Sequence, residues 1–303
     1  MKSEKHEECG PGRKNIGDEA AAGKGHKMGL FKSREEKKKE MMQFLNAELN
    51  GPHPLLKAQG IYAVYAKSSK LPYVEQDPSS AKVATYLFTD QMIAQAMAQG
   101  LSAHYNVEVR VCRAEKIPGF MKSLRLQGIE VVFWGKPGVS ASGGRNIERV
   151  PITELDKTPA PNAALSAAIC FYVQALDALF KLQDDPNSNP ADIETAKAAR
   201  ASFRAHLLSC FRPDTKLDLI VQRDASGQLS YRNTTVEIPG KTERAICVYT
   251  NEIEADKALK TGESKMTVTA AELPTLVGMG PINLDSESSA FVMPSAQIAE
   301  RLK

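Results

Sequence analysis

The sequence predicts an α+β protein built from two tandem similar units, each a small mixed sheet with flanking helices, joined by an αα-hairpin. A short apolar run that ends in an aromatic residue, Thr and then an acid or its amide occurs twice, at 84–90 and at 245–251. The same order of helix, strand, helix, strand hairpin and helix follows each copy. Between the copies lie two long helical patterns separated by a turn. So many features in the same order indicate a duplicated building block.

Composition and charge exclude broad classes of partner. The chain has 303 residues, of which 42% are hydrophobic and 25% are charged, as is typical of a globular protein. The net charge of +3 arises in the first 40 residues, which hold 11 Lys/Arg and 8 Asp/Glu, so the rest is formally neutral. A neutral body with only 6% aromatic residues favours neither phosphate binding nor base stacking. We therefore expect no nucleic-acid partner.

Cysteine usage and hydropathy predict a compartment. The five cysteines include no CxxC pair, and four of them lie in apolar patterns, which favours a reduced, cytoplasmic setting. We find no stretch that approaches the roughly 20 apolar residues of a membrane span, so no membrane partner is expected. No pattern of ligand spacing predicts a metal, and we expect no cofactor.

Four segments follow from the pattern: a disordered leader at 1–29, a first unit at 30–156, a linker and helical hairpin at 157–216, and a second unit at 217–303. The leader has almost no large apolar side chain to bury. The segment 28–33 fits a myristoylation pattern only if the chain starts at Met28, which makes Met28 a candidate natural start.

The first unit begins with a helical pattern at 32–50. Strands are then expected at 61–66, 71–74, 84–88, 107–111, 129–134 and 147–150, with helices after Asp90, around Pro118 and after Pro151. We interpret Asp90 as a helix cap and not as a catalytic acid. Its counterpart in the second copy is Asn251, and an amide caps as well as a carboxylate but cannot replace it as a general acid or base.

The loop between the last two strands of the first unit is a candidate binding site. It is rich in Gly and Ser, and Lys136, Arg145 and Arg149 lie around it. Backbone N–H groups of such a loop can capture an anion. The alternative is a mobile hairpin tip without a ligand.

The hairpin and the second unit repeat these signals. Helices are expected at 162–183 and from Pro190, with Asn189 as the cap of the second. His206 has no second ligand at metal spacing and is expected to be a packing residue. The second unit is predicted to contain strands at 217–222, 229–231, 236–238, 244–249, 266–268, 281–284 and 290–292. Glu254 lies three residues after Asn251, as in a capping box.

Two features resemble a known family. These are Phe88-Thr89-Asp90 after an apolar strand, and the run of Ile282-Asn283-Leu284, a turn, Ala290-Phe291-Val292 and then 294–302. They are similar to the N-terminal-type domain of the enhanced serine sensitivity (SseB) family, over about 60–156 and 217–303. The resemblance implies a cytosolic bacterial α+β protein without accepted catalytic residues, so no site residue transfers. The first unit departs from the family at 131–134 and has a longer hairpin loop.

Three functions stay open. The leading hypothesis is a non-enzymatic interaction or regulatory protein with a protein partner or self-association. The alternative is a module that binds a small metabolite or anion between the units or at the 135–149 loop. A third is an enzyme, although no histidine lies in a recognisable catalytic motif and no residue is singled out as catalytic.

Overall fold

The structure is a computed structural model that describes residues 35, 38–39, 51–139, 145–238 and 240–303, with no side-chain detail at 136–139 and 145–146. The chain divides into two units, Met1–Gly51 and Pro52–Lys303. In the unit Met1–Gly51, the described residues Glu35, Lys38 and Lys39 are helical. The expectations for the leader, for Met28 and for the remainder of the 32–50 helix lie outside the described residues.

The unit Pro52–Lys303 contains two seven-stranded sheets, confirming the predicted α+β class with two separate mixed sheets. A 3₁₀ turn, η1 (Pro54–Lys57), precedes the first sheet. The first repeat is β1 (Gly60–Ala66), β2 (Leu71–Pro72), β3 (Glu75–Gln76), β4 (Val83–Phe88), α2 (Gln91–Leu101), β5 (Val107–Arg113), η2 (Ala114–Lys116), α3 (Ile117–Leu126), β6 (Val131–Val139), β7 (Arg145–Pro151) and α4 (Ile152–Leu155).

The helical hairpin follows as α5 (Ala163–Asp184) and α6 (Pro190–Cys210). The second repeat is β8 (Lys216–Arg223), β9 (Leu229–Tyr231), β10 (Asn233–Ile238), β11 (Lys241–Tyr249), α7 (Glu252–Ala258), β12 (Ser264–Thr269), α8 (Leu273–Val277), β13 (Pro281–Leu284), β14 (Phe291–Pro294) and α9 (Ser295–Arg301). Every strand expected from the pattern in this part of the chain has a counterpart here, with shifts of a few residues at the ends.

The two sheets have the same connectivity. In the first, β1 pairs with β2, β4 and β5, and β4 also pairs with β3 and β6, which pairs with β7. In the second, β8 pairs with β9, β11 and β12, and β11 also pairs with β10 and β13, which pairs with β14. The parallel pairs, β4 with β6 and β11 with β13, also correspond. The duplication inferred from the sequence is therefore present in the strand pairing.

Register assigns equivalent residues in the two repeats. Phe88 pairs with Tyr62 and Tyr249 pairs with Asp218, so Phe88 and Tyr249 hold the same place. Further along, the backbone N–H of Tyr73 donates to Val64 O at 2.8 Å. The N–H of Arg232 donates to Ile220 O at the same distance, which makes Tyr73 and Arg232 equivalent.

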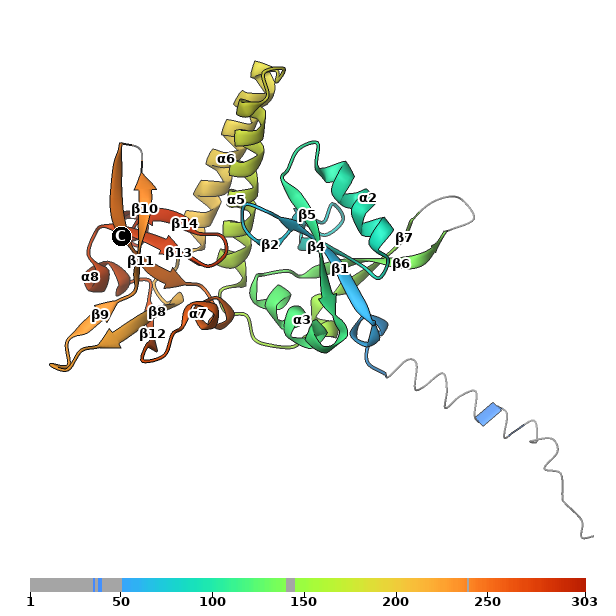
Figure 1. Cartoon of the computed structure of the whole chain (residues 1–303), viewed down its shortest axis with the longest axis horizontal. Helices are drawn as coiled ribbons and strands as arrows, with labels where there is room; N and C mark the ends of the chain where they lie inside the picture. Colours follow the sequence, from blue (N-terminus) through green and yellow to red (C-terminus); the bar gives the residue numbers. More distant parts are fainter. Residues whose placement is uncertain (1–34, 36–37, 40–50, 140–144, 239) are drawn as a thin grey trace, which may run out of the picture. The chain divides into compact units, whose positions relative to one another are not determined.

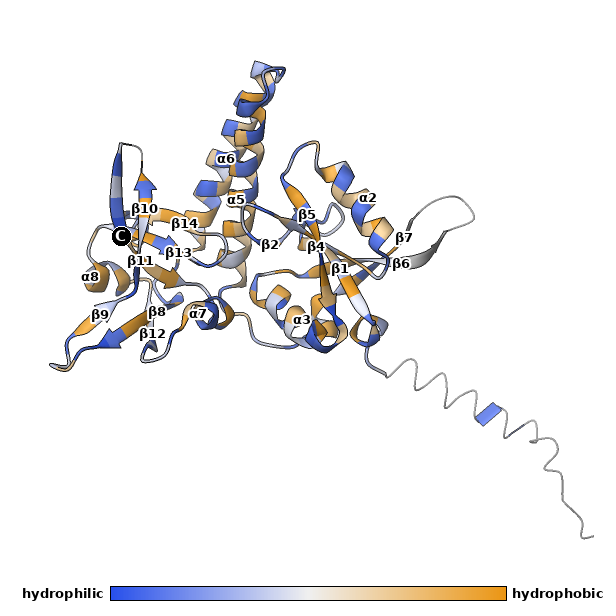
Figure 2. Cartoon of the chain, viewed as in Figure 1, coloured by the Kyte–Doolittle hydropathy of each residue, from blue (hydrophilic) through white to orange (hydrophobic). Residues whose placement is uncertain are grey.

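Helices cover both faces of each sheet. In the first repeat α3, α4 and part of α5 cover one face, around Ile61, Leu87 and Val132. The other face carries Val64 and Phe88 and is covered by α2. The ribbon of α2 carries both hydrophobic and hydrophilic residues (Figure 2), as its position between sheet and solvent requires.

The second repeat is layered in the same way. One face packs against α5, α6, α8 and α9 in the larger core cluster. The other face is covered by α7, which packs Ala255 and Ala258 against Ile220, Cys247 and Tyr249. In Figure 1, α7 lies close to the second sheet.

Helix α5 belongs to both cores. Its Leu165 and Ile169 pack in the core of the second repeat, whereas Cys170 packs in that of the first. By length and composition α5 is apolar enough to cross a membrane, contrary to the expectation that no segment approaches this. Half of its apolar window is buried in the fold, and buried core helices pass the same test.

Helix caps form where the Thr–acid and Thr–amide corners predict them. The Asp90 carboxylate accepts from Met92 N at 2.8 Å and from Ile93 N at 3.3 Å. Asn251 Oδ1 accepts from Glu254 N at 3.2 Å. The expected capping box is only half formed, because the Glu254 carboxylate accepts from Ser288 Oγ and Lys257 Nζ.

The Gly-rich loop of the first repeat is shorter than expected. Strand β6 continues to Val139 and β7 begins at Arg145, so part of the predicted loop is sheet. At Gly135 a Cβ would overlap the Phe88 ring, so a residue without a side chain is needed for β6 to pass beside that ring. The tip at 140–144 lies outside the described residues.

Candidate ligand pocket on the second repeat

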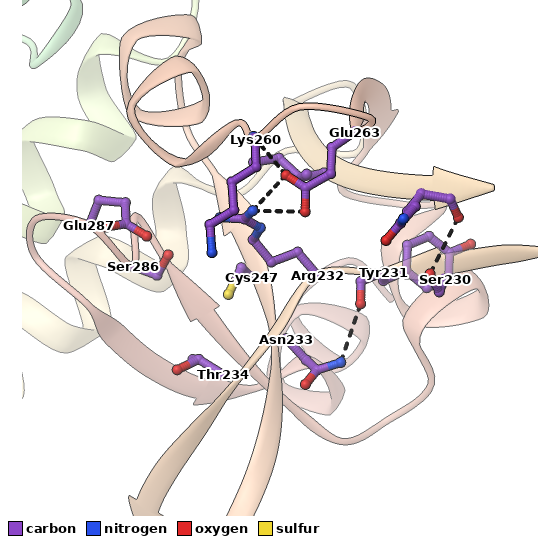
Figure 3. A pocket seen from close by; sticks show the side chains of 12 residues that line it. Ser230, Tyr231, Arg232, Asn233, Thr234, Cys247, Lys260, Glu263, Ser286 and Glu287 are labelled. Atoms are coloured by element: carbon purple, nitrogen blue, oxygen red, sulfur yellow. Dashed lines mark hydrogen bonds and ion pairs between the residues drawn. The ribbon is translucent and has the colours of Figure 1, made fainter. Parts of the chain in front are cut away.

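A polar cavity of about 500 Å³ lies on the sheet face of the second repeat that α7 partly covers. Figure 3 shows it from close by, with Cys247 deep among the side chains. Its lining comes from strands β8 to β11, the loop between α7 and β12, and the turn between β13 and β14. The lining residues are Ile220, Gln222, Ser230, Tyr231, Arg232, Asn233, Thr234, Cys247, Lys260, Glu263, Ser286 and Glu287.

A comparison of the repeats explains why this face is open. Helix α2 has 11 residues, but its counterpart α7 has 7 and covers less of the sheet. By register, Cys247 and Arg232 hold the places of Tyr86 and Tyr73. The centroid of the Tyr86 ring lies 5.2 Å from that of the Phe133 ring and 6.3 Å from that of the Phe88 ring. At these two places the first repeat has aromatic rings, whereas the second has a thiol and a guanidinium.

Arg232 is held by the protein itself. Its Nη2 donates to Glu263 Oε1 at 2.7 Å and also to Oε2 (Figure 3), and its Nη1 donates to the carbonyl of Ala258. The two side chains are only 13% and 16% exposed. This bonding raises the pKa of Arg232 and lowers the pKa of Glu263. Arg232 therefore fastens the loop after α7 to the sheet and has little charge left for a ligand.

Two other charges line the cavity without such partners. Lys260 comes from the loop after α7, and Glu287 comes from the turn between β13 and β14. Both are exposed. Within the described part of the chain, neither charged group forms an ion pair or hydrogen bond. In Figure 3 the ammonium of Lys260 points into the space between Ser286 and Arg232.

The remaining pocket groups are neutral. Burial raises the pKa of the Cys247 thiol, so at neutral pH it is a protonated thiol and a poor nucleophile. Burial also raises the pKa of Tyr249 to about 12, and its hydroxyl lies 3.2 Å from Ser286 Oγ. No histidine lines the cavity, and the described residues contain no group of three potential metal ligands.

A buried carboxyl pair fixes the turn that carries Ser286 and Glu287. Asp285 is 4% exposed and accepts from Thr250 N at 2.8 Å and from Thr250 Oγ1 at 2.7 Å. Glu254, 2% exposed, accepts from Ser288 Oγ at 2.7 Å. Burial, and then the nearby charge of Glu254, raise the pKa of Asp285 to about 7. These bonds join the turn to β11 and α7 and so position one wall of the pocket.

The site predicted from the sequence lies elsewhere. Arg149 forms an ion pair with Asp77, and its Nη2 lies 3.2 Å from Ser80 Oγ, so its charge is neutralised within the first repeat. Hydrogen bonding from Ser80 is the main cause that lowers the pKa of Asp77 to about 2. Lys136 lies on β6 and Arg145 begins β7, but their side chains lie outside the described residues. Anion capture at this loop stays a prediction.

Sequence reasoning did not identify the pocket residues. The signal was present in the repeat itself, since Cys247 stands where the first copy has Tyr86. The smaller side chain at this position leaves space on this face of the sheet, and that difference would have pointed to the pocket.

His206 does not have the packing role expected from the sequence. Its side chain is exposed and lines a separate cavity of about 630 Å³ beside Phe203.

Comparisons with known proteins leave the family open. No protein-family model matches the chain, and no curated protein matches it. One solved structure, described as Anabaena Tic22 (protein transport), is 10% identical, with 74% of this chain and 84% of that chain covered at a TM-score of 0.20. A likeness at that score carries no argument about fold or function. The resemblance to the SseB family stays a prediction.

Proposed function

We propose that the chain is a non-enzymatic binding protein whose second repeat holds a small polar ligand. The observation that carries this proposal is the polar cavity over Cys247, at a place where the first repeat packs Tyr86. Its volume of about 500 Å³ lies within the range of small-molecule sites. Two walls are fixed by internal bonds, the Arg232–Glu263 pair and the Asp285–Thr250 contacts, and a preformed site binds at lower entropic cost.

The chemistry of the lining favours binding over catalysis. A nucleophile needs a base beside it or a lowered pKa, and Cys247 has a raised pKa and no histidine in the cavity lining. The hydroxyls of Ser230, Thr234 and Ser286 can instead donate and accept hydrogen bonds to a bound polar molecule. This reading develops the metabolite-binding alternative, at a new location.

A protein partner and a cytoplasmic location remain separate predictions. Affinity purification from the native host with mass spectrometry tests the first. Reproducible absence of partners would count against an interaction role and would leave ligand binding unaffected.

Blocking the cavity tests the proposal. Thr234 lines the pocket, whereas its neighbour Thr235 is exposed and does not line it. Successive residues of a strand point to opposite faces, so Thr234→Tyr should fill the pocket and Thr235→Tyr is the matched control. Thermal unfolding is measured with a panel of small polar acids, amines, sugars and amino acids at millimolar concentration.

We expect at least one compound to raise the Tm of the wild type and of T235Y but not of T234Y. Equal stabilisation of both variants would place binding elsewhere. A panel that stabilises none of the three proteins would contradict ligand binding by this pocket.

A further inference from the structure

The pocket has two kinds of charged residue. Arg232 and Glu263 form an ion pair with each other, whereas Lys260 and Glu287 form none with the described residues. Arg232 and Glu263 bind each other through two hydrogen bonds, so together they present little net charge. Lys260 and Glu287 remain, one positive and one negative, and their charged groups are more than 4 Å apart, since they form no ion pair. They come from different segments, the loop after α7 and the turn before β14.

Because Lys260 and Glu287 are charges of opposite sign that are unpaired among the described residues, the pocket disfavours ligands that carry charge of only one sign. A phosphate or dicarboxylate attracted to Lys260 would be repelled by Glu287, and a polyamine would meet the reverse. A neutral sugar could use the hydroxyls but would leave both charges without a partner. A molecule that carries both charges a few ångströms apart can satisfy both.

Resting on the proposed function, we propose that the ligand is a small zwitterion that binds Lys260 through its carboxylate and Glu287 through its ammonium group. Ser286 lies beside Glu287 on the same turn and is oriented by the Tyr249 hydroxyl 3.2 Å away. Ser286 is thus placed to add a hydrogen bond to the bound ammonium or carboxylate.

Calorimetric titration with free amino acids as zwitterionic probes tests this. For the amino acid that binds best, its amide keeps only the ammonium and its N-acetyl derivative keeps only the carboxylate. We expect each derivative to bind about tenfold or more weakly, because one charge-assisted contact is lost. Lys260→Met should weaken the parent about as much as it weakens the N-acetyl form, and Glu287→Gln should weaken the parent and the amide.

The most discriminating experiment exchanges the charges of Lys260 and Glu287. Lys260→Glu and Glu287→Lys should each abolish binding, and the double variant should regain it, because a zwitterion can turn around. The exposed Lys67 and Glu115 of the first repeat provide controls, Lys67→Met and Glu115→Gln, that should bind as the wild type does. Tm values of all variants verify folding.

The outcomes separate the two proposals. Binding of acids or sugars that T234Y abolishes, without binding of any amino acid, overturns the zwitterion and leaves the pocket function standing. Amino-acid binding that K260M and E287Q leave unchanged also overturns it. If no compound in either panel binds, both proposals fail.

Discussion

At the scale of single residues, the buried Asp285 holds in place the turn that forms one wall of the pocket. Its backbone lies in the left-handed region at φ 52°, and its carboxyl is buried with two bonds from Thr250 and the Glu254 charge close by. Burial makes the charged form costly, which raises its pKa to about 7. The wall that carries Glu287 therefore contains a group that titrates near neutral pH.

Replacing Asp285 by Asn should change how stability depends on pH. In the folded chain the pKa is about 7, against 3.8 ordinarily, so between these values the folded state holds a proton that the unfolded state has lost. The unfolding free energy of the wild type should thus fall as pH rises through this window, by up to about 1.4 kcal/mol per pH unit, and then level off.

Urea denaturation at pH 5 and pH 8 measures this. D285N keeps an acceptor for Thr250 N, and Asn tolerates a positive φ, so it should fold and lack this fall. The exposed Asp214 supplies a control, Asp214→Asn, which should follow the wild type. The same loss of stability from pH 5 to pH 8 in D285N and wild type would refute the assignment.

At the scale of elements, the two corners after β4 and β11 begin helices. Asp90 and Asn251 both accept backbone N–H bonds of the following first turn. An acid in one copy and an amide in the other, in the same structural role, support capping as the common purpose.

Substitution at Asp90 separates a cap from a reacting carboxylate. Asp90→Asn should change the unfolding free energy by a few tenths of a kcal/mol, whereas Asp90→Ala should lower it by about 1 kcal/mol. Chemical denaturation measures both, with N251D as the reciprocal control. A D90N variant that retains stability but loses a measured activity would contradict the capping role.

The sequence was informative for the long helices and for most strands because they carry local signals. The apolar run of β4, the cap Asn189 and the terminating Gly128 at φ 83° predict structure from neighbouring residues alone. The pocket carries no such signal. Arg232, Lys260 and Glu287 meet only after three separate segments fold together, and their charges resemble ordinary surface charges in the sequence. Likewise, only the fold shows that Arg149 is paired with Asp77.

At the scale of the whole molecule, two repeats of the same strand topology differ in the side chains on one face of the sheet. Both repeats have the same strand pairing, and α5 contributes to the core of each. Gln174 on α5 accepts from Val74 N at 2.9 Å and donates to Val74 O at 2.8 Å, fixing α5 to the first repeat. Asn162, just before α5, donates to Thr250 O at 2.7 Å in the second. The first repeat has aromatic rings at Tyr73 and Tyr86, and the second has a polar cavity at the equivalent Arg232 and Cys247.

The most direct measurement is a backbone-assigned ¹H–¹⁵N correlation spectrum, recorded with and without the best-binding compound from the amino-acid panel. We expect the amide signals of Arg232, Cys247 and Ser286 to shift, while those of Tyr73 and Tyr86, which hold the places of Arg232 and Cys247 in the first repeat, stay in place. Shifts confined to the first repeat or to the α5–α6 hairpin, with none around the pocket, would contradict the claim that the second repeat is the ligand site.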